Sequence, residues 1–175
     1  PVHILKADGG TMLLAQARQM PVESILSGPA ASVMGISSLC NIVSDAIALD
    51  IGGTTTDISL YADGEPIIEP HGISLNNFPT LVRSLATRSI GIGGDSVIRL
   101  SGGGVQVGQE RVGPSMADGG DVPTLIDAMN YAKKVFYGDY ASSAKGIEAL
   151  AKTGGMSPDM LASEAIARAL KKIKQ

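Results

Sequence analysis

The feature that most constrains this chain is a ten-residue segment in which an apolar strand candidate runs into glycines and hydroxyls. It reads Ala48-Leu49-Asp50-Ile51-Gly52-Gly53-Thr54-Thr55-Thr56-Asp57. Residues 46–50 are apolar up to the final Asp50, and residues 57–62 alternate polar and apolar side chains, as half-buried strands do. Strands joined by so short a loop pair in antiparallel fashion. The segment therefore predicts a hairpin with a tight loop over residues 52–56.

The loop has the chemistry that a magnesium nucleotide requires. Gly52 and Gly53 allow backbone amides to approach an anion, and the hydroxyls of Thr54, Thr55 and Thr56 add donors for phosphate oxygens. Carboxylates at both strand ends could hold the waters of Mg²⁺. We therefore interpret Asp50 as a catalytic magnesium ligand, with Asp57 sharing the ion or fixing the loop. The alternative is an ordinary glycine hairpin with surface threonines, in which Asp57 caps a turn.

Three further turns are candidates for anion binding through exposed amides. They comprise Asp8, Gly9 and Gly10; Ser27 and Gly28; and Gly91, Gly93 and Gly94. The first is expected to head a helix that runs from Thr11 toward Gln19, with the Asp8 carboxylate facing a cleft, although a plain turn is equally consistent. The second opens a helix at Pro29. The third either cradles a ligand or merely bends the chain between strands.

Composition argues against several classes of function. The chain has 14 Lys and Arg against 17 Asp and Glu, a net charge of -3, and only six aromatic residues, so neither nucleic acid nor a membrane surface is an expected partner. Cys40, the single cysteine, is interpreted as a small buried hydrophobe in a reducing, cytoplasmic compartment. A start at Pro1 suggests a piece of a longer polypeptide.

The remaining pattern predicts one α/β domain over residues 1–175, helical from about residue 124 onward. Ten glycines in residues 91–120 surround strand candidates at 96–100 and 105–108. The helices are expected at 124–135, 142–152 and 158–174. Thr124 and Asp127 are interpreted as a helix cap without a functional role.

Residues 50–57 resemble the second phosphate motif of the superfamily of actin, sugar kinases and heat-shock chaperone ATPases. The whole chain resembles the hydantoinase A and 5-oxoprolinase family more closely, because a series of short motifs occurs in the family's order. The matching pieces are Asp8-Gly9-Gly10, residues 27–31, residues 50–57, residues 90–94, Val107-Gly108, Gly119-Gly120, Pro123-Thr124 and Asp127-Ala128. Ile92 and Asp95 stand where that family usually has an alanine and a third glycine.

This resemblance implies a ribonuclease H-like lobe with a mixed sheet, a phosphate-binding hairpin and flanking helices, forming the central part of a bilobal subunit. It implies ATP and Mg²⁺ as cofactors, Asp50 and Asp8 as catalytic residues, and a small cyclic amide such as hydantoin, N-methylhydantoin or 5-oxoproline as substrate. The lactam oxygen would be phosphorylated before water opens the ring. The implied partners are the rest of its own subunit and a second, hydantoinase B-type subunit or domain.

Other functions are compatible with these residues. An ATP-dependent ketone carboxylase of the acetone or acetophenone type is the nearest enzymatic alternative, because such enzymes resemble the same family and also phosphorylate an oxygen. A non-catalytic module switched by nucleotide, in the manner of actin or a chaperone, is the alternative from another class. A glycine-rich structural domain without a ligand is the third.

Overall fold

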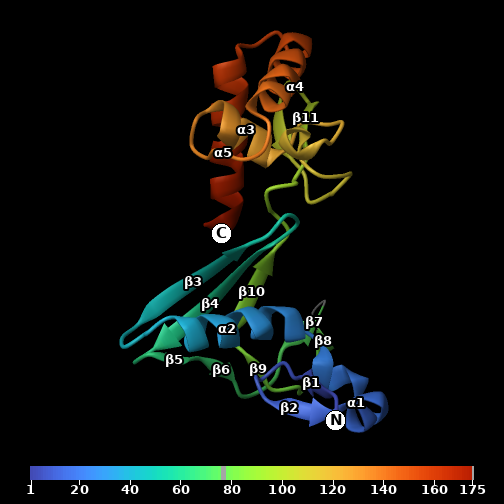
Figure 1. Cartoon of the computed structure of the whole chain (residues 1–175), viewed down its shortest axis with the longest axis vertical. Coiled ribbons are helices and arrows are strands. Elements are labelled where there is room, and N and C mark those ends of the chain that lie inside the picture. The colour runs from blue at the N-terminus through green and yellow to red at the C-terminus, as the bar shows by residue number, and fades with distance from the viewer. Residues whose placement is uncertain (76–77, 175) are drawn as a thin grey trace. The chain divides into compact units, whose positions relative to one another are not determined.

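The computed structural model describes residues 1–75 and 78–174, and the chain divides into two compact units. The first unit comprises residues 1–50 and 57–89, and the second comprises residues 51–56 and 90–175. This division differs from the single domain that the sequence suggests. The chain passes between the units at residues 50–51, 56–57 and 89–90, at or next to strand ends, so no linker composition marks the crossings (Figure 1).

The first unit combines helices with short antiparallel strands. Its helices are α1 (Leu14–Gln19), a 3₁₀ turn (Pro21–Ser24) and α2 (Ser27–Leu39). Its strands are β1 (His3–Leu5), β2 (Thr11–Leu13), β3 (Ala46–Ile51), β4 (Thr56–Ala62), β5 (Glu65–Pro66), β6 (Ile68–Glu69), β7 (Ser74–Leu75), β8 (Phe78–Pro79), β9 (Ser84–Leu85) and β10 (Thr87–Ile90), of which β3, β4 and β10 also reach the second unit. The main sheet has the order β10-β4-β3, and β5 also pairs with β4.

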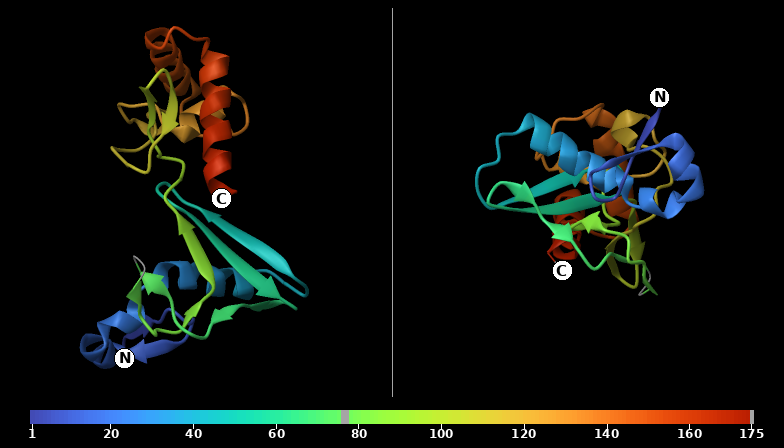
Figure 2. Two further views of the ribbon diagram at one scale, coloured as in Figure 1. Left: turned by 180° about the vertical axis from the view of Figure 1, so that it is seen from behind. Right: turned by 90° about the horizontal axis from the view of Figure 1, so that it is seen from below.

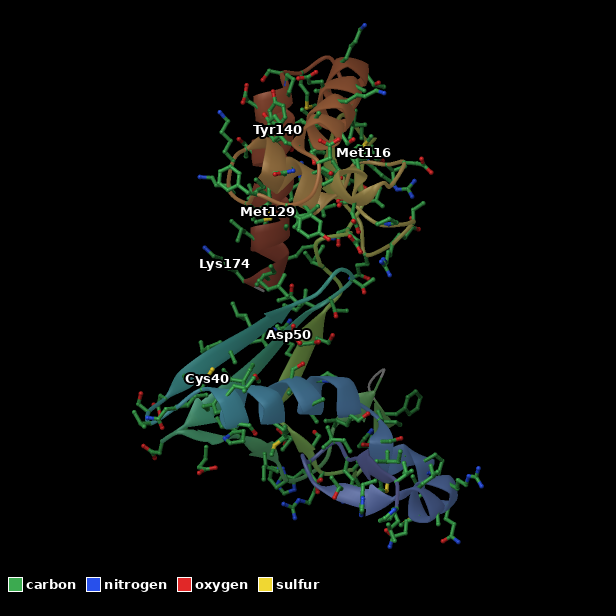
Figure 3. The ribbon with its side chains drawn as sticks, viewed as in Figure 1. Cys40, Asp50, Met116, Met129, Tyr140 and Lys174 are labelled. Carbon is green, nitrogen blue, oxygen red and sulfur yellow. The ribbon has the colours of Figure 1, made fainter. Side chains whose placement is uncertain are left out.

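Helix α2 covers this sheet and confirms the helix that the sequence predicts to open at Ser27-Gly28-Pro29. Ala30 and Val33 are buried against Tyr61 and Leu85, and the Tyr61 hydroxyl donates to the Val33 carbonyl over 3.0 Å. Because the Tyr61 ring is buried and its hydroxyl is hydrogen-bonded to α2, this residue fixes the helix on β4. Cys40, directly after α2, is exposed, so its interpretation as a buried hydrophobe is wrong (Figure 3).

The first helix begins later than the sequence predicts. Thr11 was expected to cap it, but residues 11–13 form β2 and pair with β1, with His3 opposite Leu13 and Leu5 opposite Thr11. The helix therefore starts at Leu14. Strand pairing with a segment upstream has overridden a local cap signal, which a pattern along the chain cannot reveal.

The second unit packs three helices against a two-stranded hairpin (Figure 2). Its elements are β11 (Ile98–Ser101), β12 (Gly104–Val107), a 3₁₀ turn (Met116–Asp118), α3 (Leu125–Tyr131), α4 (Tyr140–Thr153) and α5 (Pro158–Ile173). Ile147, Leu161 and Val105 are fully buried in its core. The Ser157 hydroxyl accepts from the Met160 amide and caps α5, whereas α3 ends four residues earlier than the expected 124–135.

The strand pairs with a described register are all antiparallel. In the β11–β12 hairpin Ile98 lies opposite Val107 and Ser101 opposite Gly104, and the turn between them uses Gly102 and Gly103 with φ angles of 59° and 79°. Glycine adopts such angles without steric cost. Across the described part of the chain, no helix has the length and apolar character needed to cross a bilayer.

Candidate functional site

The loop between β3 and β4 is the tight hairpin loop that the sequence predicts. The Gly52 amide donates to the Thr55 carbonyl over 2.9 Å and closes it, while Gly53 and Thr54 are exposed. Among the described residues, the amides of Gly53, Thr54 and Thr55 have no hydrogen-bond acceptor. Unpaired backbone donors at an exposed turn are available to an anion. That phosphate binds there stays a prediction.

A second glycine segment supports this loop from within the second unit. The amides of Gly94 and Asp95 donate to the carbonyls of Gly52 and Gly53 over 2.9 and 2.7 Å. A Cβ atom on Gly93 would lie 2.5 Å from the Gly52 oxygen, which is closer than real Cβ contacts allow. Glycine at position 93 is therefore needed for the two backbones to touch.

Two of the amides in the glycine segment are already engaged within the protein. The Gly93 amide donates to the Ser96 hydroxyl over 3.0 Å, and the Gly94 amide is used by the hairpin loop. Gly91 is packed against Gln109, whose side chain would lie 3.0 Å from an added Cβ. Gly93 and Gly94 therefore support the hairpin loop, and ligand binding by Gly91, Gly93 and Gly94 stays a prediction.

Thr56 also belongs to this support. Its side chain is 1% exposed, and its hydroxyl donates to the Ile92 carbonyl over 2.7 Å. Because that hydroxyl is already engaged and buried, it cannot face a phosphate without breaking the contact. The hydroxyls available to a ligand are those of Thr54 and Thr55.

Asp95 is the site residue whose role sequence reasoning missed. Its Oδ2 forms an ion pair with Arg111, 2.9 Å from Nε, and the same oxygen would lie 2.5 Å from a Cβ on Gly53. The ion pair holds a neutralised carboxylate against the hairpin loop and explains why position 53 is glycine. The sequence signal for this role was the aspartate itself, which stands where the family usually has a third glycine.

The two predicted metal ligands belong to the strands on either side of the loop. Asp50, near the end of β3, is exposed (Figure 3). It accepts a hydrogen bond from the Ser32 hydroxyl of α2. Asp57, in β4, has a buried Oδ1 atom with no partner among the described residues. An orphan carboxylate oxygen is costly unless a cation or water satisfies it. Mg²⁺ commonly uses one or two carboxylates together with waters, so these residues fit it.

No cluster of three or more His, Cys, Asp or Glu side chains suited to a metal occurs within residues 1–75 and 78–174. A site closed entirely by protein ligands therefore has no support in that part of the chain. A hydrated ion held by few carboxylates needs no such cluster.

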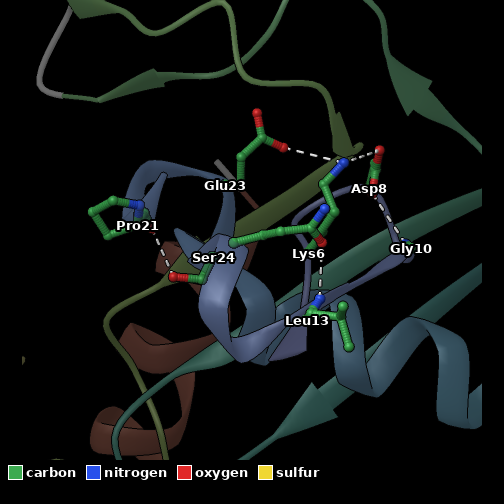
Figure 4. Close-up of polar contacts among 8 residues, drawn as sticks. Lys6, Asp8, Gly10, Leu13, Pro21, Glu23 and Ser24 are labelled. Carbon is green, nitrogen blue, oxygen red and sulfur yellow. Dashed lines mark hydrogen bonds and ion pairs between the residues drawn. The ribbon is translucent and has the colours of Figure 1, made fainter. Parts of the chain in front are cut away.

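The turn at Asp8 is closed and does not head a helix, so the plain turn is the correct one of the two sequence-based interpretations (Figure 4). A catalytic role of Asp8 stays a prediction. The Asp8 carboxylate accepts from the Gly10 amide at 3.0 Å and from Lys6 Nζ at 3.3 Å, and Gly9 donates to the Lys6 carbonyl. Both glycine amides are therefore used within the turn. The β1–β2 pairing that displaced the helix start also produced this hairpin turn.

The charges around Asp8 are balanced locally. Lys6 also contacts Glu23 at 3.1 Å, and that hydrogen bond raises the pKa of Lys6 (Figure 4). Burial alone would raise the pKa of Asp8, but the Gly10 amide and the Lys6 ammonium outweigh burial and lower it. A carboxylate stabilised in its charged form by fixed partners is a poor proton acceptor. The group is a structural ion-pair network.

Within the described part of the chain, the first turn of α2 has backbone amides that are free of hydrogen-bond acceptors, as the sequence suggests. Nothing lies within 4 Å of a Cβ placed on Gly28, and Leu26 supplies no side-chain cap. Among the described residues, the amides of Ser27 and Gly28 have no acceptor. Helix α2 also supplies Ser32 to Asp50, so one helix orients a predicted magnesium ligand and leaves its first amides free.

Comparison with known proteins gives a consistent family. The model of the family described as hydantoinase/oxoprolinase matches residues 1–175. A 5-oxoprolinase of Saccharomyces cerevisiae is 32% identical over 136 residues, which cover 73% of this chain and 10% of the yeast protein. 5-Oxoprolinase 1 of Arabidopsis thaliana is 33% identical over 119 residues, covering 64% of this chain and 9% of the plant protein.

A solved structure has the same fold. The nucleotide-free structure of an acetone carboxylase, described as an ATP-dependent enzyme, matches 91% of this chain with a TM-score of 0.74 and 23% identity. This chain covers 25% of that carboxylase chain. The fold is accordingly the actin-like ATPase type implied by the sequence resemblance, and the chain spans about a tenth of the two oxoprolinases.

Proposed function

The chain belongs to the hydantoinase/oxoprolinase family, and on that premise we propose that residues 50–57 hold the phosphates and Mg²⁺ of ATP in an enzyme that opens a small cyclic amide. The observation that carries this proposal is the exposed loop whose amides at Gly53, Thr54 and Thr55 are unpaired among the described residues. Carboxylates at Asp50 and Asp57 flank that loop in the sequence. An ordinary surface hairpin would not require a second glycine segment hydrogen-bonded to its loop.

Each residue has a distinct role in this proposal. The amides of residues 53–55 and the hydroxyls of Thr54 and Thr55 donate to phosphate oxygens. Asp50, oriented by Ser32, holds a water on Mg²⁺, and the orphan Asp57 Oδ1 accepts from a second water or the ion's shell. Gly93 and the Asp95–Arg111 ion pair keep the loop fixed, so that these donors are positioned before the nucleotide arrives.

The chemistry that we propose begins with attack of the lactam oxygen on the γ-phosphorus, which breaks the bond to ADP. The phosphorylated ring carbon is a better electrophile than the amide, so water adds to it. The adduct then expels the ring nitrogen, which takes up a proton, so the C–N bond breaks and an acyl phosphate remains. A second water attacks the acyl carbon and displaces inorganic phosphate, which carries the former lactam oxygen and leaves a carboxylate. The donors of the loop neutralise charge on the transferred phosphoryl group. The substrate class includes 5-oxoproline, hydantoin and N-methylhydantoin.

The remainder of the subunit and a second, hydantoinase B-type subunit are the proposed partners, because the chain covers only about a tenth of its oxoprolinase relatives. We place the enzyme in the cytoplasm, where a free cysteine such as Cys40 stays reduced.

An isotope experiment tests the proposed reaction. The full-length protein is incubated with ATP, Mg²⁺ and 5-oxoproline or hydantoin whose ring carbonyl carries ¹⁸O. Ring opening with transfer of ¹⁸O into inorganic phosphate is the expected result, because the lactam oxygen leaves with the phosphate. ATP hydrolysis that no cyclic amide stimulates would contradict the proposal. Stimulation only by a ketone together with bicarbonate would identify the carboxylase alternative instead.

The non-catalytic alternative has its own signature. A module switched by nucleotide would bind ATP and polymerise or bind peptide without any cyclic amide. Light scattering of the full-length protein with ATP, in the absence of substrate, separates this alternative from an enzyme. The proposal predicts no ATP-dependent increase in scattering.

A further inference from the structure

A cavity of about 440 Å³ opens on the second unit beside strand β12 and helix α5. Three of its lining residues, all from α5, are basic. The lining consists of Gln106, Val107, Gly108, Arg168, Lys171 and Lys172. A volume of this size accommodates a small ligand. The hairpin loop and the Asp50 and Asp57 carboxylates contribute nothing to its lining.

The three cations lie on one face of α5. Residues 168, 171 and 172 are spaced three and four apart, a spacing that brings side chains together on a helix. Among the described contacts, the acidic residue that pairs with these cations is Glu164, which lies 2.6 Å from Arg168. Lys171 forms no ion pair among the described contacts. The cavity wall therefore has excess positive charge in a chain whose net charge is -3.

Two of the cations are held in place by the hairpin. Lys172 Nζ donates to the Val107 carbonyl over 2.8 Å. Arg168 Nη2 would lie 3.2 Å from a Cβ on Gly104, so the guanidinium rests against a strand position that has no side chain. Fixed cations lose less conformational entropy when they bind an anion than free surface lysines do. The wall is thus organised for a ligand.

Helix-dipole stabilisation does not account for this arrangement. Basic residues are favoured in the last turn of a helix, which explains Lys171 and Lys172 by their position alone. That effect fades beyond the last turn, and it requires no contact between Lys172 and the Val107 carbonyl and no cavity. Arg168 lies before the last turn and still faces the same cavity.

We propose that this cavity is an anion site for a small molecule carrying a phosphate or pyrophosphate group. The guanidinium and the two ammonium groups supply donors without acceptors, which suits oxygen anions. The site also adjoins the support of the hairpin loop, because Gln109, next in sequence to Gly108, packs on Gly91. The source of the phosphate is a nucleotide or free pyrophosphate, and competition distinguishes them.

The test uses inorganic pyrophosphate as the probe, titrated into the 175-residue chain at low salt and followed by calorimetry and by the amide NMR signals of Gln106 and Gly108. Lys171→Gln and Lys172→Gln are compared with Lys134→Gln. Lys134 is an exposed lysine on the connection between α3 and α4, outside the cavity lining. Circular dichroism melts verify that each variant folds.

Wild-type binding that perturbs both amide signals and weakens about tenfold in each cavity variant is expected, because each variant removes one charge-assisted contact. The Lys134→Gln variant should bind within about twofold of wild type. Competition by ATP would identify a nucleotide as the source, and its absence would identify free pyrophosphate; both results support the site. No binding at millimolar probe, or equal weakening in the Lys134→Gln variant, would overturn it.

Discussion

At the scale of single residues, the absence of a side chain at Gly93 decides whether the two glycine segments can touch. Its close approach to the Gly52 carbonyl could not be anticipated, because the partner lies some forty positions away in the sequence. The carboxylates at residues 50 and 57 could be singled out from their neighbours alone. The free hydroxyls could not be identified from the sequence, because three threonines follow one another at residues 54–56. Only the contact with Ile92 distinguishes Thr56 from the other two.

Gly93→Ala should separate the hairpin loop from the glycine segment that supports it. The new Cβ would meet backbone atoms of Gly52 and Gly53 at 2.5 Å, and backbone cannot rotate away as a side chain can. We expect a loss of about 1–3 kcal/mol in the free energy of unfolding and large shifts of the Gly52 and Gly53 amide NMR signals. Gly113→Ala is the control, since nothing lies within 4 Å of its Cβ position. Unchanged Gly52 and Gly53 signals in Gly93→Ala would refute the close contact.

Asp127 has a structural role. Its side chain is 0% exposed and accepts hydrogen bonds from the amides of Met116, Ala117 and Thr124 and from the hydroxyls of Thr124 and Ser143. The carboxylate closes the capping box of α3, which confirms that Thr124 and Asp127 cap this helix. It also ties α3 to the 3₁₀ turn and to α4.

Asp127→Asn should destabilise the second unit by about 1–3 kcal/mol, because an NH₂ group would face donors that need an acceptor. Urea unfolding measures the loss. Asp118→Asn, an exposed carboxylate in the adjacent 3₁₀ turn, is the matched control and should change stability by less than about 0.5 kcal/mol. Equal midpoints for the two variants would mean that the buried network contributes nothing.

At the scale of elements, segments defined by their own sequence were predicted well. Pro29 in the first turn of α2 and Ser157 before α5 specify local structure, and the helices expected at these places are present. The start of α1 was mispredicted because β2 depends on β1, and the end of α3 because Lys133 leaves the helix with a positive φ of 55°. Non-local pairing and an unfavourable φ carry no local signal.

The N-terminus of α4 provides a test of a cap through pH. The pKa of Asp139 lies below its usual 3.8 because its carboxylate accepts hydrogen bonds. The bond from the Ser142 hydroxyl has the largest effect, and the bond from the Ala141 amide has the next largest. A carboxylate with a lowered folded pKa stabilises the protein above its unfolded pKa, and that contribution is lost as pH falls through the folded value.

Between pH 6 and pH 3, the melting temperature of wild type should therefore fall more than that of Asp139→Asn, which retains a capping oxygen but no charge. Thermal melts at half-unit intervals measure both curves, with Asp121→Asn, an exposed carboxylate elsewhere in the second unit, as the control for general charge. Parallel curves for wild type and Asp139→Asn would show that the charge of Asp139 does not stabilise α4.

At the scale of the whole molecule, family and fold could be anticipated because many short motifs occur in order, from Asp8-Gly9-Gly10 to Asp127-Ala128. The division into two units could not, because the crossings fall at strand ends without a change in composition. Several motif residues also have structural roles, as Asp8 and Asp127 demonstrate. A motif therefore identifies a fold more securely than it identifies a ligand.

The central claim is that Asp50 holds Mg²⁺ beside a phosphate-binding loop, and the most direct test is ATP hydrolysis by the full-length enzyme over a range of Mg²⁺ concentrations. Asp50→Asn is compared with Asp63→Asn, which changes an exposed turn carboxylate at a positive φ that Asn also tolerates. We predict a loss of about 10²–10³ in kcat and a higher Mg²⁺ requirement for Asp50→Asn alone, with unchanged melting temperature. Full activity and the same Mg²⁺ dependence in both variants would contradict the claim.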